Sequence, residues 1–330
     1  MDHNERGESA MKINYTKRYV IVTLLLIVCA ILSLSAGAVW ISPITVLKEV
    51  WTGKQFILTE YRVPRMLLGI LVGFALAVSG AVIQGVIRNP LASPDVIGIT
   101  KGASLAAVIV IIVFPTAPLF VLPLASFVGA LVISLILSLL ISLKGIKGSQ
   151  LALIGMAIGA VAMALVQYLL IRSPMEANIA LVWLTGSLFG RSMDHVLTIL
   201  PWMIVSLPVI FFYAKKLDIL HLGEEVATAL GTPVKRTKMI LLFAAVMLAG
   251  SAISVVGGLS FLGLIAPHIA RSIVGHRHGH IIAMSGLVGA LLMVIGDGLA
   301  RVIAPPIDIP VGVLIAVIGA PYFLYVLRKM

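Results

Sequence analysis

The sequence predicts an all-α polytopic membrane protein with about ten transmembrane helices. The 330 residues are 60% hydrophobic, with a mean hydropathy of +1.14, and only 11% are charged. A soluble domain cannot bury that much apolar surface, because its surface area falls too slowly relative to its volume. The apolar residues also gather in long runs, and a helix of about 20 apolar residues crosses the hydrocarbon core of a bilayer.

Ten apolar segments can be delimited along the chain. They cover residues 19–40, 64–87, 95–113, 118–143, 150–171, 195–214, 238–258, 260–275, 281–301 and 309–327. Backbone in lipid must satisfy its own hydrogen bonds, so each segment is expected to be a helix. Two of them are weak spans, because residues 95–113 follow Pro90 and Pro94, and residues 260–275 are short and contain Pro267.

The first segment, Tyr19 to Trp40, follows a polar stretch, residues 1–18, with four basic side chains. A basic start, an apolar run and small residues are also the pattern of a cleaved signal peptide. The run is long for a signal peptide, and the rest of the chain is membrane-embedded too. We therefore expect a first span, preceded by a cytoplasmic tail over residues 1–18.

The basic residues predict the orientation of the chain. With ten spans and a cytoplasmic N-terminus, 16 of the 24 Lys and Arg residues fall on the cytoplasmic side and 7 on the outer side, while Lys101 lies within a segment. Basic residues gather in cytoplasmic loops. The net charge of +11 thus indicates topology rather than nucleic-acid binding. We expect one transmembrane domain, residues 1–330, in the cell membrane, with both termini cytoplasmic.

Glycines recur within the segments at the spacing that allows helices to approach closely. Gly69 and Gly73 form one such pair, and Gly155 and Gly159 form another. Small residues four apart let two helix backbones pack together in a membrane. We interpret most of these glycines as packing residues.

The most basic cytoplasmic loop, residues 215–238, contains a short predicted helix. The stretch from Leu222 to Leu230 is followed by Gly231 and then Pro233, a pattern typical of a helix end. One interpretation is a helix presented to a cytoplasmic partner. The other is an amphipathic helix that lies on the lipid headgroups.

Few polar residues fall within the segments, and these are expected to face protein or water because they are costly in lipid. Asp297 and Arg301 are four residues apart and share one helix face. They could form a mutual salt bridge, or Arg301 could face a partner outside. Asp297 is the one acidic residue well inside a long run, which argues against a carrier driven by protons or sodium ions.

No catalytic or metal-binding pattern stands out. The chain contains no G-x-x-x-x-G-K-[ST] phosphate loop, no HExxH and no GxSxG, so we expect neither an enzyme nor an ATP site. The single cysteine, Cys29, has no metal-ligand spacing around it. The histidines of the stretch 275–280, GHRHGH, lack nearby carboxylates and are interpreted as a solvated basic turn. We predict no metal and no cofactor.

Several stretches together resemble the permease subunits of the ATP-binding-cassette (ABC) importers for iron siderophores and cobalamin, the FecCD-type permease family. They are RVPR at 62–65, GAVIQGVIRNPLASPDVIGITKGAS at 80–104, LGEEVATALG at 222–231, GGLSFLGLIAPHIARSIVG at 257–275, GDGLAR at 296–301 and IPVGVLIAVIGAPYFLYVLRK at 309–329. The resemblance extends from about residue 60 to the C-terminus. The combination of stretches is highly specific.

This resemblance implies a ten-helix permease with the type II ABC importer fold, paired with a second permease subunit that is identical or homologous. Two cytoplasmic ATPase subunits and an extracytoplasmic binding protein would complete the transporter. The permease would move its ligand by alternating access. Ferric siderophores are the expected cargo, with cobalamin or haem as alternatives within the family. An ion-coupled secondary carrier and a membrane scaffold are alternatives outside it.

The resemblance also implies roles for individual residues. The short helix in the 215–238 loop is expected to couple to the ATPase through Glu224, Glu225, Leu230 and Gly231. The helix dipole alone also favours acids at a helix start. The arginines expected to meet acidic residues of the binding protein are Arg62, Arg65 and Arg301. Residues near the two weak spans are expected to line or gate the pathway, and these are Gln84, Asn89, Pro267 and His268.

The sequence departs from the family pattern at two positions. Asp308 stands before Ile309 and Pro310 where the family usually has Glu, so the charge is kept on a shorter side chain. Lys101 stands where a small or polar residue is common. We interpret Lys101 as a side chain that snorkels toward the inner membrane surface.

Overall fold

The computed structural model describes residues 14–37, 39–52, 55–118, 120–144, 148–305 and 307–329. Every regular element in these ranges is a helix, so the prediction of an all-α protein is confirmed. Residues 1–13 of the expected tail lie outside the described residues. The first helix begins at Tyr15 rather than at the predicted Tyr19, because the Asn14 side chain caps it by accepting a hydrogen bond from the Lys17 amide at 3.1 Å.

Among the described residues, seven helical spans are long and apolar enough to cross a membrane. They are α1 (Tyr15–Ser35), η1 with α3 (Ile57–Arg62 and Val63–Ile87), α5 (Val121–Lys144), α6 (Gly148–Arg172), α8 (Met193–His221), α10 (Val234–Val256) and α12 (His278–Val302). Three further apolar helices are α4 (Ile99–Val113), α11 (Leu262–Val274) and α13 (Val311–Lys329). Each of the ten predicted segments contains one of these helices, as expected for a multi-pass membrane protein.

The two segments predicted to be weak spans contain the two shortest of these apolar helices. At 1.5 Å per residue, the 15 residues of α4 and the 13 of α11 rise about 22 and 20 Å, less than the ~30 Å of a hydrocarbon core. An irregular connection precedes each helix. Gly98 and Gly257, with φ of 84° and 91°, provide left-handed backbone in these connections, which glycine adopts without a Cβ clash.

Short helices also occupy the predicted loops. Residues 41–63 contain α2 (Pro43–Thr52) and the π-helical η1, residues 172–194 contain α7 (Pro174–Leu184), and residues 215–237 contain α9 (Glu224–Ala229). The predicted short helix in the basic loop is therefore confirmed. These stretches lie between the predicted apolar segments and were expected to be loops, so the sequence did not predict α2, η1 or α7.

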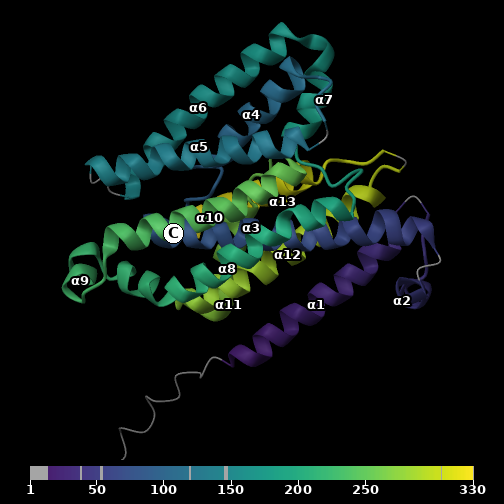
Figure 1. Cartoon of the computed structure of the whole chain (residues 1–330). Helices are drawn as coiled ribbons and strands as arrows, with labels where there is room; N and C mark the ends of the chain where they lie inside the picture. The colour runs from purple at the N-terminus through teal and green to yellow at the C-terminus, as the bar shows by residue number, and fades with distance from the viewer. Residues whose placement is uncertain are drawn as a thin grey trace, which may run out of the picture.

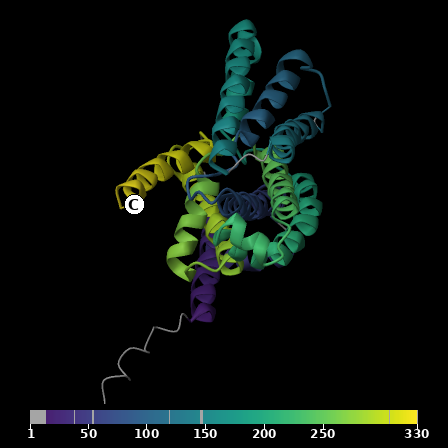
Figure 2. The ribbon, with the colours of Figure 1, turned by 90° about the vertical axis from the view of Figure 1, so that its left-hand side faces the viewer.

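The helix α3 lies at the centre of the bundle, surrounded by α8, α10, α11 and α12, as the end-on view shows (Figure 2). Within their apolar windows, 72% of α3 and 78% of α10 are buried, compared with 22% of α6. Helices α4 to α7 form a layer on one side of this bundle, and α1 lies on the opposite side (Figure 1). The core is therefore built around α3 and α10, while α6 presents most of its side chains outward.

Glycines bring α3 into close contact with two neighbours. A Cβ atom on Gly73 would collide with the backbone carbonyl of Gly289 in α12, and one on Gly80 would collide with that of Gly263 in α11. Only residues without side chains allow backbones this near to each other. The predicted packing role is confirmed for Gly73, and for Gly155, whose Cβ would meet the Ile97 carbonyl.

The helix α9 and the helix α2 lie at opposite ends of the bundle (Figure 1). The start of α1 and the C-terminus lie at the same end as α9. We refer to these as the α9 end and the α2 end. Helix α3 runs from the α2 end to the α9 end. Arg65 lies near its start, and Arg88 follows its last residue.

Candidate functional site

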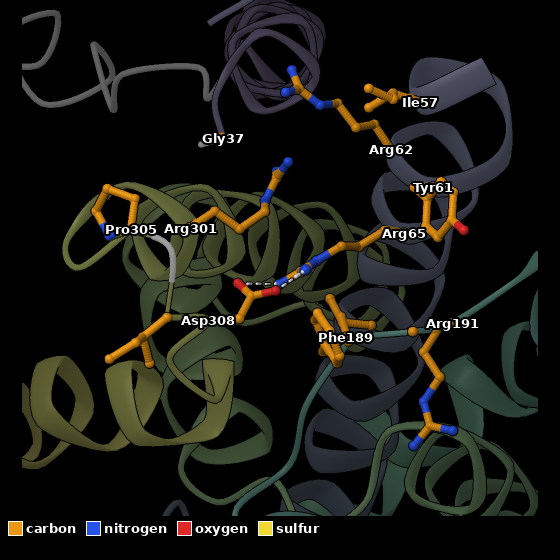
Figure 3. Close-up of a pocket in the computed structure, with 13 residues that line it drawn as sticks. Gly37, Ile57, Tyr61, Arg62, Arg65, Phe189, Arg191, Arg301, Pro305 and Asp308 are labelled. Carbon is orange, nitrogen blue, oxygen red and sulfur yellow. Dashed lines mark hydrogen bonds and ion pairs between the residues drawn. The ribbon is translucent and has the colours of Figure 1, made fainter. Parts of the chain in front are cut away.

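A pocket of about 240 Å³ opens at the α2 end of the bundle, and we call it the arginine pocket (Figure 3). Residues from the end of α1, from η1 and α3, from the α7–α8 connection and from α12 with the following loop line it. The polar and aromatic lining consists of Arg62, Arg65, Arg191, Arg301, Asp308, Tyr61 and Phe189. All three arginines that the sequence predicted for binding-protein docking are therefore brought together in one place.

Arg62 and Arg301 hold the C-terminal end of α1. The η1 π-helix ends at Arg62, whose guanidinium donates to the carbonyls of Leu34 at 2.7 Å and Val39 at 2.6 Å. Arg301, in the last turn of α12, donates to the Ser33 carbonyl at 2.8 Å. The last carbonyls of a helix lack intrahelical partners and carry partial negative charge, so two cations stabilise them there.

Arg65 is paired with two carboxylates. Its guanidinium lies 2.8 Å from Asp297 and 2.6 Å from Asp308. Asp297 is only 2% exposed and also lies 3.3 Å from Arg301, so one buried carboxylate serves two arginines. The sequence left open whether Arg301 pairs with Asp297 or faces outward. In the structure Arg301 does pair with Asp297, and its remaining donors turn toward α1.

Arg191 completes the pocket from the α7–α8 connection. In Figure 3 it lies beyond Phe189, with its guanidinium pointing away from the Arg65–Asp308 pair. Its Nη1 is 3.3 Å from His195, and its Nε has no hydrogen-bond partner among the described residues. Burial lowers the pKa of the Arg191 guanidinium, although arginine keeps its charge in proteins. Sequence reasoning missed this residue, because nothing near it in the chain marks it.

The pocket carries more positive than negative charge. Four guanidinium groups line it or reach it, against the carboxylates of Asp297 and Asp308. A guanidinium binds a carboxylate through two parallel hydrogen bonds, so such a surface suits an acidic partner. Arg62 and Arg65, however, are only 8% and 9% exposed, and their hydrogen bonds are spent inside the chain. Arg62 and Arg65 therefore stabilise the fold themselves, by bonding other parts of the same chain.

At the α9 end, the segment Leu222–Gly231 forms a compact helical turn. Its end is a Schellman motif, in which the amide of Gly231 donates to the Thr228 carbonyl and the amide of Thr232 donates to the Ala227 carbonyl, both at 2.9 Å. Gly231 has φ of 74°, the left-handed conformation that the motif needs, and a Cβ there would enter open space. The predicted importance of Gly231 thus has a conformational reason.

Apolar side chains form an exposed ridge on this segment. Leu222, Val226 and Leu230 follow each other at intervals of four residues and are 65%, 45% and 61% exposed. Val226 and Leu230, four residues apart, share one face of α9, whereas Leu222 ends α8 and is separated from α9 by Gly223. Ala227, on the opposite side, is fully buried. The two predicted acids differ, because the Glu225 side chain is exposed whereas Glu224 accepts a hydrogen bond from Lys238 at 2.7 Å.

The residues expected to line or gate a pathway divide into two groups. Asn89 lines a cavity of about 340 Å³, which we call the loop cavity because residues of the α3–α4 connection form much of its wall. His268 lines a smaller neighbouring cavity that shares Leu91 and Leu264 with the loop cavity, and its ring lies 6.0 Å from that of Tyr322. Gln84 and Pro267 are buried in helix packing, and the Gln84 side chain bonds Arg271 and the Leu264 carbonyl of α11.

Asp308 and Lys101, the two residues that depart from the family pattern, each form an ion pair. Asp308 reaches Arg65 despite its shorter side chain. Lys101 lies 2.9 Å from Asp95, so its ammonium is held by a carboxylate in the α3–α4 connection. The predicted solvated turn at residues 275–280 is wrong for His278, which is buried at the start of α12. His278 bonds Asp218 at 2.7 Å, and the ring of His280 stacks on that of Tyr15 at 4.0 Å.

Replacing Asp297 by Asn is expected to destabilise the protein by about 3 kcal/mol, because removing one partner leaves two buried guanidinium groups without their shared counter-charge. Thermal unfolding of the purified protein in detergent measures this loss. The matched control is Glu60→Gln, which removes an exposed carboxylate of η1. An equal stability of both variants would show that Asp297 is not the counter-charge of this cluster.

Comparison with known proteins identifies the family. The model of the FecCD transport family matches residues 25–329. The chain is 47% identical to a Fe(3+)-citrate import system permease protein of Bacillus subtilis, covering 94% of each chain. It is 43% identical to a Fe(3+) dicitrate transport system permease protein of Escherichia coli, covering 94% of this chain and 98% of the relative. An iron(3+)-hydroxamate import system permease protein of Bacillus subtilis is 38% identical, covering 93% of this chain and 95% of the relative.

A solved structure agrees with this assignment. An ABC transporter of the metal-chelate type, in an inward-facing conformation, superposes with a TM-score of 0.84 at 29% identity, covering 96% of this chain and all of that chain. The architecture, the family match and the relatives therefore agree over nearly the whole length. The family consists of transport permeases rather than enzymes. The chain belongs to the FecCD transport family and is a membrane permease subunit of an ABC importer.

Proposed function

We propose that this permease imports a ferric chelate, with ferric citrate as the first candidate among ferric siderophores. The proposal rests on the two relatives of 47% and 43% identity, both of which carry ferric citrate in their names, whereas the hydroxamate relative is 38% identical. Cobalamin and haem are the alternative cargoes of the same kind of importer. The chain hydrolyses no ATP itself, so an ATPase must supply the energy.

The ATPase docks on α9. The observation that carries this proposal is the exposed ridge of Leu222, Val226 and Leu230 at the α9 end. Exposed apolar side chains on a short helix and at its two ends fit a hydrophobic groove of a partner protein. The start of α1 and the C-terminus lie at the same end (Figure 1). This placement and the excess of basic residues on the predicted cytoplasmic side support the proposal that both termini are cytoplasmic.

The binding protein docks at the α2 end, over the arginine pocket. The excess of guanidinium groups favours an acidic partner and speeds the encounter through long-range attraction. Arg191 is the group best placed to take a new carboxylate, because it is half-buried whereas Arg62 and Arg65 are buried, and among the described residues its guanidinium bonds His195 alone. Arg62, Arg65 and Arg301 shape the pocket and contribute its field while bonded internally.

A second permease subunit, identical or homologous, completes the translocation pathway. The loop cavity would form part of the wall of this pathway, since it gathers Asn89 and residues of α6, α11 and α13. The helix α6 is little buried within the chain, which leaves an apolar face for a partner or for lipid. Alternating access then requires that the cavity opens in turn to each side.

Replacing Val226 by Asp is expected to abolish binding of the ATPase, because it places a charge in the middle of the apolar ridge. Co-purification of the tagged permease with its ATPase from membranes measures the effect. Val226→Ile, which keeps the apolar surface, should bind as the wild type does. Full ATPase recovery with Val226→Asp would show that the ridge is not the docking surface.

Replacing Arg191 by Glu is expected to weaken binding of the extracytoplasmic binding protein at least tenfold, since truncating a hydrogen-bonded charge pair costs about 2 kcal/mol or more. Surface plasmon resonance with the permease in nanodiscs measures the affinity. Lys48→Glu in α2 makes the same charge change at an exposed site and is the control. If both variants bound the binding protein with equal affinity, Arg191 would not be part of the docking surface.

Radio-iron uptake by a deletion strain, complemented with this chain, tests the cargo. Ferric citrate is expected to restore uptake, whereas ferric hydroxamates and ferric catecholates are not. Gly231→Asp, which strains the end of α9, should fail to complement although it reaches the membrane. If the chain restored the use of cobalamin or haem but no uptake of ferric iron, the protein would still be an importer permease, and its cargo would be cobalamin or haem instead of a ferric chelate.

A further inference from the structure

We propose that Glu224 and Arg88 form a tether that carries the motion of α9 to the loop cavity. The tether is distinct from the apolar ridge that meets the ATPase. It connects α9 to the α3–α4 connection, whose residues Asn89, Leu91, Ala92, Ser93, Asp95 and Val96 line the loop cavity. This inference rests on the proposed docking of the ATPase at α9.

Glu224 faces the permease rather than the partner side of α9. Its Oε1 accepts a hydrogen bond from Lys238 at 2.7 Å and lies 3.5 Å from the Nη2 of Arg88. Lys238 belongs to α10 and its side chain is only 8% exposed, so it is a fixed anchor. The neighbouring Glu225 is exposed on the same turn. The two acids of α9 thus have different roles, although the sequence presents them as equivalent.

Arg88 is the residue at which α3 ends and the α3–α4 connection begins. Its backbone is left-handed, with φ of 56° and ψ of 40°, an uncommon conformation for a residue with a side chain. Its amide donates to the Gln84 carbonyl and so stays joined to the last turn of α3. The turn reverses the chain at this point and brings the guanidinium within reach of Glu224.

The connection that follows Arg88 is internally bonded. The Asn89 side chain accepts from the Leu91 amide at 2.9 Å, and the Ser93 hydroxyl accepts from the Val96 amide at 3.2 Å. Each of these four residues lines the loop cavity. A segment held by its own hydrogen bonds moves as a unit, so a displacement of Arg88 shifts this part of the cavity wall.

The last turn of α3 supplies the pivot for such a displacement. Gln84 is buried and its side chain bonds Arg271 of α11 and the Leu264 carbonyl. Leu264 also lines the loop cavity, from the opposite element. The chain before Arg88 is therefore fixed to α11, whereas Arg88 itself is paired with α9 through Glu224. Motion of α9 relative to α11 would then change the width of the cavity.

The test uses the complete transporter, with its ATPase and binding protein, reconstituted in proteoliposomes and supplied with ferric citrate. The readout is iron transported per ATP hydrolysed, measured beside ATPase co-purification. Arg88→Gln and Glu224→Gln should each lower transport per ATP about fivefold or more, the range of a typical coupling between sites. Both variants should keep the ATPase bound and hydrolysing. The double variant should be no worse than either single variant, because all three break one contact.

Two controls separate the tether from a general effect on α9. Arg236→Gln removes an exposed arginine charge at the start of α10 and should leave transport per ATP unchanged. Arg88→Lys should retain most of the transport per ATP by keeping the ion pair with Glu224. Arg88→Gln leaves the surface of α9 intact, so it tests the tether even if Glu224→Gln does not fold.

An Arg88→Gln variant that transports as much iron per ATP as the wild type would overturn the tether. So would a double variant whose fold-loss of transport per ATP equals the product of the fold-losses of the two single variants. Loss of ATPase binding in Glu224→Gln would overturn it too, by assigning Glu224 to the docking surface. The proposed function fails by a different result, namely a wild-type permease that binds no ATPase or transports no ferric citrate.

Discussion

The close packing of α3 against α11 and α12 is the contact on which the rest of the structure depends. In lipid no hydrophobic force drives helices together, so backbones must approach closely enough for dispersion and polar contacts to hold them. Gly73 and Gly80 provide that approach, because a side chain at either position would overlap a carbonyl of the neighbouring helix. The central position of α3 has a functional consequence. Its first turn contributes Arg65 to the arginine pocket, and the residue that follows its last turn, Arg88, faces α9.

The arginine pocket shows how a membrane protein can keep several cations at one end of a bundle. Isolated buried charges are costly, and each guanidinium here needs acceptors. The structure supplies them from two sources, the free carbonyls at the end of α1 and the carboxylates of Asp297 and Asp308. The carbonyls accept hydrogen bonds but carry no net charge, so the four guanidinium groups still outnumber the two carboxylates. The pocket is thus both a clasp for α1 and an electropositive surface, and Arg191 has the fewest internal bonds among its arginines.

Much of the fold could be predicted from the sequence, because hydropathy and length are local properties. The ten apolar segments each contain a helix, and the helix end at Gly231 appears in the structure as a Schellman motif. The family could be identified as well, since its motifs are short contiguous stretches. The arginine site was predicted in part. Arg62, Arg65 and Arg301 do meet, but their hydrogen bonds to α1 and to Asp308 join residues far apart in the chain, and no local pattern encodes them.

The sequence by itself determined that the chain is a polytopic helical permease, that it lacks a phosphate loop, and where the short helix of the basic loop ends. These properties follow from composition, periodicity and contiguous motifs. Only the tertiary structure decided which charges are paired. Glu224 and Glu225 are adjacent and chemically identical, yet one faces Lys238 and Arg88 while the other faces outward. The physical reason is that the partners of a side chain depend on how helices distant in sequence pack together, and in this protein glycine contacts around α3 set that packing.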